Sequence, residues 1–346
     1  MKISQSINSI SPTLRILNIV GTPFAETEKA SANRVDELHQ YAISNKMHLF
    51  FLESLSRHNI DTFSEEFKQL VERYERVNET IMKIAETLEK NNIEYSFFKS
   101  IRPYKEVTVD IDTIIFNDRQ KTTQVLKDAG FKLLEVGPLS TTLRDEKSSI
   151  NIDLYEEIGI SHFIYIDKRK LHRFIVRKRI GDGNAVNSLD AVADLLAIIS
   201  HSIIKEQMYV LSEYLTTIHY LHQMSRPEIY RLMETAQEWK LGKALSTHLS
   251  ITSIIHFQAH KFVPKPLQTL QEITSYNVRE AERIREKKYV TPYKYHPLTV
   301  IDSLLEKLPE PTAKRSLAIQ ITKLTNPTFA SHFIKQASKH LERQEY

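Results

Sequence analysis

The stretch Tyr95-Ser-Phe-Phe-Lys-Ser-Ile-Arg-Pro-Tyr-Lys-Glu-Val-Thr-Val-Asp-Ile-Asp-Thr-Ile-Ile115 carries the pattern that decides the fold. Its β-branched and aromatic residues predict two neighbouring strands, at 93–98 and 107–116, joined by a loop with Pro103. Asp110 and Asp112 are two residues apart in the second strand, so both carboxylates should leave the same face. Two unpaired anions side by side repel each other, and a divalent cation removes that conflict. The stretch therefore predicts a sheet that carries a metal site.

A third carboxylate follows on a later predicted strand. Alternation within Ile150-Asn-Ile-Asp-Leu-Tyr155 places Asn151 and Asp153 on one face. Three acids on neighbouring strands can hold two ions, and Mg²⁺ (or Mn²⁺) is the expected metal because it favours oxygen ligands and substrate phosphates. Two such ions suit in-line displacement at phosphorus. The alternatives are that Asp110-x-Asp112 binds no metal, and that Asp153 caps an edge or pairs with Arg144.

The following segments predict the remainder of a small mixed sheet. Asn117-Asp118 begins a helix that runs to Ala129 and ends at Gly130. Strands are then predicted at 131–136 and 149–155, with 141–144 pairing between them. The last predicted β element is a hairpin of 174–180 and 185–187, with Gly181-Asp182-Gly183-Asn184 as its turn.

Helices are predicted on both sides of this β region in the sequence. Residues 1–30 show no sustained period, whereas periodic apolar residues predict long helices at 32–59 and 64–91. Amphipathic segments predict further helices at 189–205, 207–223, 226–239, 241–257 and, after Pro264 and Pro266, 267–287. An aromatic, proline-containing break at 289–297 precedes two short closing helices. The expected fold is α+β, divided into an N-terminal helical region 1–92, a sheet core 93–187, a helical domain 188–262 and a basic C-terminal helical region 263–346.

Composition excludes several functional classes. The chain has no cysteine, which excludes disulfides, thiolate nucleophiles and cysteine-based zinc sites. It has only 7 glycines and neither a GxGxxG nor a GxxxxGK[ST] pattern, which argues against Rossmann and P-loop nucleotide sites. No run reaches the roughly 18 apolar residues of a membrane helix, and the first residues lead into no apolar signal core. We therefore expect a cytoplasmic protein with no membrane partner, and nothing in the sequence indicates its oligomeric state.

Positive charge is concentrated near the C-terminus. The net charge is only +4, but residues 276–346 alone carry 13 Lys and Arg against 8 Asp and Glu. This excess favours RNA as a partner. The basic run 168–179 could follow an RNA backbone, with a solvated hairpin face as the alternative that the sequence favours. Tyr289, Tyr293, Tyr295 and His296, among lysines, could stack on bases or form an interdomain wrap.

The order of these motifs resembles that of a known enzyme superfamily. A strand, Lys99-Ser100, a nine-residue loop, Asp110-x-Asp112, a helix and then Asp153 on a later strand resemble the polymerase-β-type nucleotidyltransferase core. A long helix leading into Asn92-Ile-Glu-Tyr-Ser-Phe-Phe-Lys-Ser100 is similar to the poorly characterised nucleotidyltransferases in which Lys-Gly precedes the paired acids. Asp194-Leu-Leu-Ala-Ile-Ile-Ser-His-Ser202, followed by Glu206 and Tyr214, resembles their helical second part. The resemblance covers about residues 32–225.

The resemblance implies an activity and a set of roles. It implies that a nucleoside monophosphate is transferred from a nucleoside triphosphate, such as ATP, to an acceptor hydroxyl. Asp110 and Asp112 are implied to bind the metal and the triphosphate, and Asp153 to support the catalytic metal and the attacking hydroxyl. RNA is the first expected acceptor, followed by a protein hydroxyl or a small molecule. The alternatives are a non-catalytic nucleotide- or RNA-binding protein on a degenerate fold, and a helical scaffold.

The chain departs from the family at its glycine motif. The family's Gly, or Gly-Ser, corresponds here to Lys99-Ser100, which lacks the close backbone approach that glycine allows. The hydroxyl of Ser100 and the charges of Lys99, Arg102 and Lys105 are the expected replacements for phosphate-binding backbone amides.

His201 and Glu206 are a further pair of potential ligand side chains. They lie five residues apart, which is a poor spacing for joint ligation on one α-helical face. Core packing or a hydrogen bond is the expected role of these two side chains.

Overall fold

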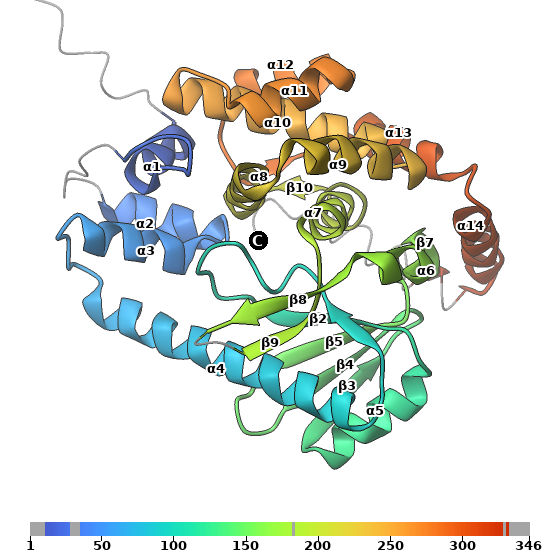
Figure 1. Cartoon of the computed structure of the whole chain (residues 1–346). Coiled ribbons are helices and arrows are strands. Elements are labelled where there is room, and N and C mark those ends of the chain that lie inside the picture. Colours follow the sequence, from blue (N-terminus) through green and yellow to red (C-terminus); the bar gives the residue numbers. More distant parts are fainter. Residues whose placement is uncertain (1–10, 28–34, 182–183, 328–329, 332–346) are drawn as a thin grey trace, which may run out of the picture.

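The computed structural model describes residues 11–27, 35–181, 184–327 and 330–331 of the chain. Within these residues, a seven-stranded mixed sheet lies between an N-terminal and a C-terminal helical part (Figure 1). The strand order is β3-β4-β5-β2-β1-β9-β8. The predicted α+β fold class is confirmed.

Two parallel strand pairs determine how the sheet presents its side chains. The strands are β1 (Tyr95–Phe97), β2 (Asp110–Ile115), β3 (Phe131–Val136), β4 (Ser140–Asp145), β5 (Asn151–Tyr155), β8 (Ile175–Ile180) and β9 (Asn184–Leu189). β2 pairs in parallel with β5, and β1 with β9, whereas the other neighbours are antiparallel. The β2–β5 register pairs Asp110 with Asn151 and Asp112 with Asp153. Because paired residues point to the same face, the acids of the two strands are neighbours.

Two helices cover one face of the sheet. They are α4 (Ser64–Lys90) and α5 (Arg119–Asp128), which lie along the same side of the strands (Figure 1). Ile84 and Leu88 of α4 belong to one buried cluster with Ile111 of β2 and Ile152 of β5. Side chains alternate along a strand, so the burial of Ile111 directs the neighbouring aspartates of β2 to the opposite face.

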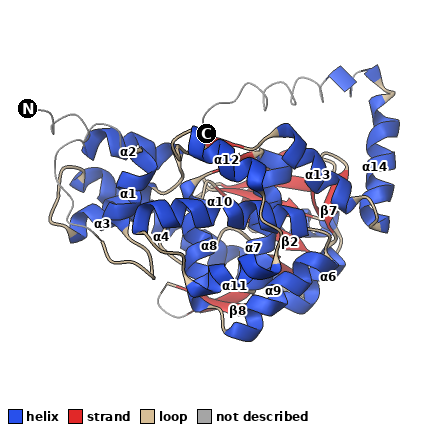
Figure 2. Ribbon diagram, turned by 90° about the horizontal axis from the view of Figure 1, so that it is seen from above, coloured by secondary structure: helices blue, strands red, loops and turns tan. Residues whose placement is uncertain are grey.

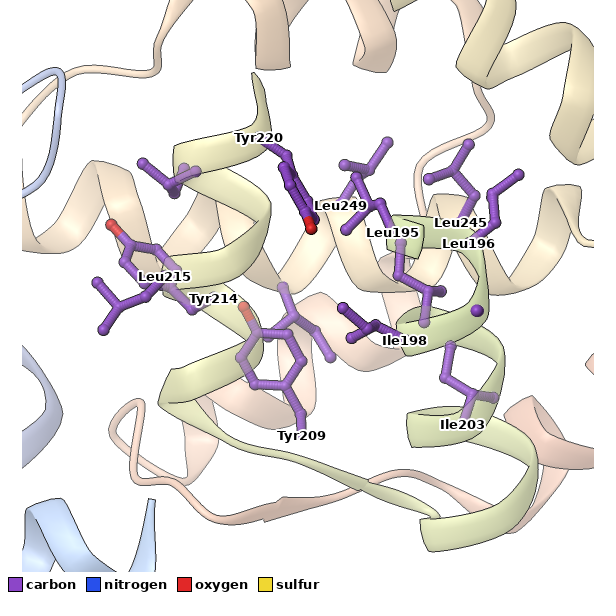
Figure 3. Packing of buried hydrophobic residues seen from close by; sticks show 14 of the residues in the cluster. Leu195, Leu196, Ile198, Ile203, Tyr209, Tyr214, Leu215, Tyr220, Leu245 and Leu249 are labelled. Atoms are coloured by element: carbon purple, nitrogen blue, oxygen red, sulfur yellow. The ribbon is translucent and has the colours of Figure 1, made fainter. Parts of the chain in front are cut away.

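The opposite face of the sheet lies below the C-terminal helices. These include α7 (Ala191–Ser200), α8 (Leu211–Gln223), α9 (Arg226–Glu238) and α10 (Gly242–His260), all near their predicted positions. Leu195 and Ile198 of α7 pack in one core with Tyr214 of α8 and Leu249 of α10 (Figure 3). Seen from above, these helices lie over the strands, with the first helices of the chain at one end and α14 at the other (Figure 2).

The N-terminal part contains more helix breaks than the sequence predicts. Its helices are α1 (Pro12–Val20), α2 (Val35–Ser44) and α3 (His48–Arg57), so the predicted single helix 32–59 is wrong, and its residues 32–34 lie outside the described residues. The Asn45 amide donates to the carbonyls of Tyr41 and Thr291, at 3.0 and 3.1 Å. The next residue, Lys46, has φ +55°. An α-helix cannot continue through this left-handed conformation.

A second break divides the predicted helix 267–287 into α11 (Lys265–Ile273) and α12 (Val278–Glu286). Asn277 caps α12, because its side chain accepts a hydrogen bond from the Glu280 amide at 3.2 Å. Its amide group also donates to Thr247 of α10 at 2.7 Å. The two predicted closing helices are present as α13 (Pro297–Lys307) and α14 (Pro311–Leu324), and residues 332–346 of the basic tail lie outside the described residues.

Several short elements have no counterpart in the sequence-based prediction. They are the hairpin of β6 (Ile158–Ile160) and β7 (Phe163–Ile166), α6 (Lys168–Leu171), a 3₁₀ turn (His172–Phe174), a π-helix (His201–Glu206), and the pair β10 (Met208–Tyr209) and β11 (Tyr293–Lys294). The predicted hairpin of β8 and β9 is present, although residues 182–183 of its turn lie outside the described part. Among the helices that are described, none has the length and apolar character needed to cross a membrane.

Candidate functional site

A cavity of about 370 Å³ lies where the acidic face of the sheet meets the helices of both helical parts. Its volume is within the usual range for small-molecule sites. Its lining includes the carboxylates Asp110, Asp112 and Asp153 and the basic side chains Lys46, Arg73, Lys99, Arg102 and Lys205. The structure thus brings together the three predicted catalytic acids and two of the four predicted phosphate-binding residues.

The three carboxylates are half-buried and lie close enough to affect one another's ionisation. Burial raises the pKa of Asp110, and the nearby charge of Asp112 raises it further. Burial also raises the pKa of Asp153, against a 2.6 Å hydrogen bond donated by the Thr142 hydroxyl. Arg144, the predicted alternative partner of Asp153, donates instead to the side chain of Asn151 at 2.9 Å. A cation at this position would offset the charge that burial and repulsion disfavour.

Lys99 already places one positive charge beside these acids. Its Nζ lies 3.2 Å from Oδ1 of Asp112 and 3.2 Å from Nδ1 of His201. Burial lowers the pKa of Lys99, and the charge of Asp112 opposes this shift. The backbone has φ +61° at Lys99, the left-handed conformation that glycine adopts most readily. The amide of Lys99 donates to Asp194 at 2.6 Å, so this backbone donor already has a partner.

Ser100 and Lys105 do not line the cavity, in contrast to the predicted phosphate contacts. The Ser100 hydroxyl donates to the carbonyl of Phe98 at 3.2 Å and accepts from the amide of Asp112 at 2.8 Å. This side chain therefore joins the loop to β2. Lys105 is exposed between two buried residues, Tyr104 and Glu106, so the local alternation directs it outward, and it lines a separate hollow.

The loop between β1 and β2 is anchored to helices on both sides. Arg102 donates to the Thr216 hydroxyl of α8 at 2.6 Å. The Glu106 carboxylate accepts hydrogen bonds from the amides of Leu49 and Phe50, each at 3.3 Å, in the first turn of α3. The loop therefore holds the N-terminal and C-terminal helical parts in a fixed relation to the acids.

The π-helix adds His201, Lys205 and Glu206 to the cavity. Nε2 of His201 lies 3.2 Å from Oε1 of Glu206, although the two residues are five apart. The five-residue spacing is poor for contact on an α-helix, but it suits a π-helix, because i to i+5 periodicity brings such residues together. Burial lowers the pKa of His201 to about 3, and the charges of Lys99 and Lys205 add to this effect. His201 is therefore a neutral imidazole at pH 7.

Three cavity residues from the N-terminal helices were not anticipated. Lys46 comes from the turn between α2 and α3, His48 from the start of α3, and Arg73 from α4. Arg73 is exposed and forms no hydrogen bond or ion pair within the described part of the chain. No motif marks these residues, and only the packing of three helices against the loop brings them to the acids.

The basic run 168–179 is largely paired with acids of other elements. Lys170 lies 2.8 Å from Glu310 near α14, and Arg173 pairs with Glu238 of α9. Arg177 pairs in the same way with a glutamate of α4. These contacts join the C-terminal helices and α4 to the segment from α6 to β8, and they leave the run without an unpaired basic stripe at these positions.

Two of the tyrosines predicted to stack on bases are buried. Tyr293 and Tyr295 are 1% and 2% exposed. The Tyr293 hydroxyl donates to Glu280, and the Tyr295 hydroxyl lies 3.3 Å from Ser202. This segment therefore corresponds to the alternative of an interdomain wrap.

The arrangement has the parts required for metal-assisted displacement at phosphorus. Oxygen ligands for a hard cation lie on β2 and β5, and cationic side chains from four other elements face the same cavity. Comparison with models of known protein families and with curated protein sequences gave no match for this chain.

Proposed function

We propose that this protein is a metal-dependent nucleotidyltransferase that moves a nucleoside monophosphate from a nucleoside triphosphate to an acceptor hydroxyl. The observation that carries the proposal is the parallel register of β2 and β5, which sets Asp112 beside Asp153 on the wall of a cavity that Asp110 also lines. In the proposed reaction, the acceptor oxygen forms a bond to the α-phosphorus, and the bond from that phosphorus to the pyrophosphate oxygen breaks.

The donor set fits Mg²⁺ or Mn²⁺. Asp110, Asp112 and Asp153 offer only oxygen atoms, which these cations prefer, and burial raises the pKa of two of the three groups. A divalent cation bound by these residues supplies stabilisation of the charge that develops on the attacking and leaving oxygens. The 3.2 Å contact of Lys99 with Asp112 supports the same interpretation, because it shows that a positive charge is accommodated beside this carboxylate.

Cationic side chains of the cavity are suited to a triphosphate. Arg73 of α4 and Lys205 of the π-helix line the cavity, and neither forms an ion pair within the described residues. Their charges remain available for phosphate oxygens, with which charge-assisted hydrogen bonds are short and strong. Arg102 lines the cavity, but its guanidinium donates a hydrogen bond to Thr216. We therefore assign Arg102 a second role, in fixing the loop.

A second candidate function is nucleotide or RNA binding without turnover. The ion pair and the hydrogen bonds around the glycine motif favour this second candidate. The Lys99 amine engages Asp112, the Lys99 amide engages Asp194, and the Ser100 hydroxyl bonds to backbone groups on both sides. If these contacts persist when a nucleotide binds, the motif has no free donor for the phosphates.

One experiment separates the two candidates. The purified protein is incubated with each labelled triphosphate, Mg²⁺ or Mn²⁺, and total RNA, and label transfer and pyrophosphate release are measured. We expect transfer that Asp153→Asn abolishes and that Asp128→Asn, an exposed acid of α5, leaves unchanged. If calorimetry shows binding of a non-hydrolysable triphosphate but no label is transferred to RNA, protein or small-molecule acceptors, the second candidate is supported. Absence of transfer together with absence of binding to the triphosphate and to the RNA rejects both candidates.

A further inference from the structure

Three side chains outside the carboxylate site converge in the N-terminal helical part. His39 lies on α2, His48 is the first residue of α3, and Glu66 is in the first turn of α4. Nε2 of His39 lies 2.8 Å from Nε2 of His48. The Glu66 carboxylate lies 3.1 Å from Nε2 of His39 and 3.2 Å from Nε2 of His48. Three potential metal ligands therefore meet at one point from three helices.

Hydrogen bonds alone do not account for all three contacts. Each Nε2 carries at most one proton when the imidazole is neutral. If both carry one, both can donate to Glu66, but the two N–H groups then face each other across 2.8 Å. If only one Nε2 carries a proton, the other Nε2 and the carboxylate oxygen beside it face each other with lone pairs. A single cation between the three groups is attractive to every one of them.

The spacing and the ligand types indicate the class of ion. With metal–ligand bonds of 2.0–2.1 Å, the edges of a tetrahedral zinc site are roughly 3.3 Å long. The two distances to Glu66, 3.1 and 3.2 Å, are close to this value, and the distance between the two imidazoles, 2.8 Å, is shorter. Two imidazoles and one carboxylate suit Zn²⁺ and similar transition metals, whereas Mg²⁺ prefers oxygen alone. We propose that His39, His48 and Glu66 bind a divalent transition metal, with Zn²⁺ as the best fit, at a site separate from the three aspartates.

The surroundings hold the ligands in position and leave access for an ion. The ring of Phe63 stacks on His39, with ring centres 4.1 Å apart, and fixes the orientation of that imidazole. The side chain of His39 is 7% exposed, but that of Glu66 is 39% exposed, so the ion can enter past the carboxylate and keep a water as its fourth ligand. Burial lowers the pKa of His48, which favours the neutral imidazole that a metal requires.

The proposed ion would join the three helices beside the main cavity. His48 lines that cavity, together with Ile43 of α2 and Leu70 and Arg73 of α4. A metal on His48 therefore fixes the cavity wall that carries Arg73. This inference does not depend on the proposed transfer activity, because its ligands and its metal class differ from those of the aspartate site.

The test is a titration of the metal-stripped full-length protein with Co²⁺, followed by visible absorption, and with Zn²⁺ in competition. We expect one equivalent of Co²⁺ to give the intense bands of a four-coordinate site, and Zn²⁺ but not excess Mg²⁺ to abolish them. His48→Gln and Glu66→Gln should each weaken binding at least tenfold. The matched controls His58→Gln, at the end of α3, and Glu65→Gln, next to Glu66, should bind as the wild type does.

Thermal unfolding provides the second readout. Zn²⁺ that binds only the folded chain should raise the Tm of the wild type and of both controls, but not that of Glu66→Gln. Because Glu66 is partly exposed, its glutamine variant tests the site even if His48→Gln does not fold. Wild-type protein without four-coordinate Co²⁺ bands, or with bands that Glu66→Gln leaves unchanged, overturns the proposal. Neither result bears on label transfer, which is measured separately with the aspartate variants.

Discussion

Lys99 combines a left-handed backbone with a charged side chain directed at Asp112 and His201. Replacing it by alanine removes the amine but keeps the strained backbone, whereas glycine removes both. We expect Lys99→Gly to be more stable than Lys99→Ala by about 1 kcal/mol, since a Cβ costs roughly 1–2 kcal/mol in this conformation. Both variants remove the amine, so they should change the affinity for a non-hydrolysable triphosphate by the same factor. Urea unfolding and calorimetry measure the two effects, and an alanine variant as stable as the glycine variant contradicts the first.

Asp110 and Asp112 should differ in what they contribute to stability, although both are proposed to bind the same metal. Transfer should fall by more than about 100-fold in Asp110→Asn and in Asp112→Asn, because loss of even an outer-shell partner of a metal ligand costs 10–100-fold. In metal-free buffer at pH 7, Asp110→Asn should raise the Tm, since burial and Asp112 raise the pKa of Asp110 and its charge is destabilising there. Asp112→Asn should lower it, because Lys99 loses its ion-pair partner. Calorimetry with a chelator checks both signs, and a lower Tm for Asp110→Asn contradicts the first.

The candidate acids could be predicted from the sequence, but the phosphate-binding residues could not. Period-two alternation on a strand fixes the side on which Asp110, Asp112 and Asp153 lie. A loop has no such period, and whether Ser100 or Lys105 faces the cavity depends on which backbone groups the loop bonds to and which neighbours are buried. Only the tertiary structure determines these contacts, so the charges around the loop could not predict which side chains face the cavity.

The helix α7 is attached to the loop after β1 by a single buried side chain. Asp194 accepts hydrogen bonds from the Lys99 amide at 2.6 Å and from the Tyr220 hydroxyl at 2.5 Å. Asp194→Ala should lower the free energy of unfolding by about 3 kcal/mol, since hydrogen bonds to charged groups contribute about 1.5–3 kcal/mol each. Tyr220→Phe should cost less, because Asp194 keeps the hydrogen bond from the Lys99 amide, although the variant also removes the 3.0 Å hydrogen bond that Lys178 donates to the hydroxyl. A double-mutant cycle in urea measures the coupling between them, and additive effects contradict a shared network.

Helices and strands with a strong period could be predicted, and their interruptions could not. The apolar spacing continues through Asn45 and Asn277, but each asparagine bonds to a residue far away in the sequence, Asn45 directly after the end of α2 and Asn277 directly before the start of α12. The strands β6 and β7 have three and four residues, too few for a period to be distinct from chance. Breaks and short strands are thus decided by tertiary contacts rather than by local composition.

The molecule as a whole should lose stability in acid because its C-terminal core contains buried histidines. Burial lowers the pKa of His248 and of His256, both on α10, to about 3. The unfolded chain therefore binds more protons at these sites between about pH 6.5 and pH 3, so they contribute stability that is lost as the pH falls through this window. His248→Phe should reduce the slope of unfolding free energy against pH by up to about 1.4 kcal/mol per unit.

The phenylalanine variant removes one hydrogen bond but leaves Thr217 with a partner. Thr217 bonds to His248 at 2.7 Å but also donates to the carbonyl of Glu213 at 2.8 Å, so it retains a partner. Urea unfolding at pH 7 and pH 5 gives the slope for the wild type and the variant. Equal slopes would mean that His248 does not carry the acid sensitivity.

The candidate site exists only in the assembled molecule. Its lining comes from α2, α3 and α4, from the sheet and its loop, and from the π-helix and α8. The three acids could be recognised in the sequence because each lies in a strand whose alternation fixes the face of its side chain. The acids are joined by Lys46, Arg73 and Lys205 only after three separate layers have packed. No local sequence pattern predicts this packing.

The π-helix between His201 and Glu206 has a genetic consequence. It holds more residues per turn than an α-helix does, so loss of a single codon within it would let the segment close as an ordinary α-helix. His201 and Glu206 would then lie four residues apart, and side chains four apart are neighbours on an α-helix, so their contact would survive. The strands that carry the aspartates would keep their reading frame and register. An in-frame deletion of three nucleotides in this segment should therefore be tolerated better than one in a neighbouring α-helix, where every later side chain would rotate by about 100° around the axis.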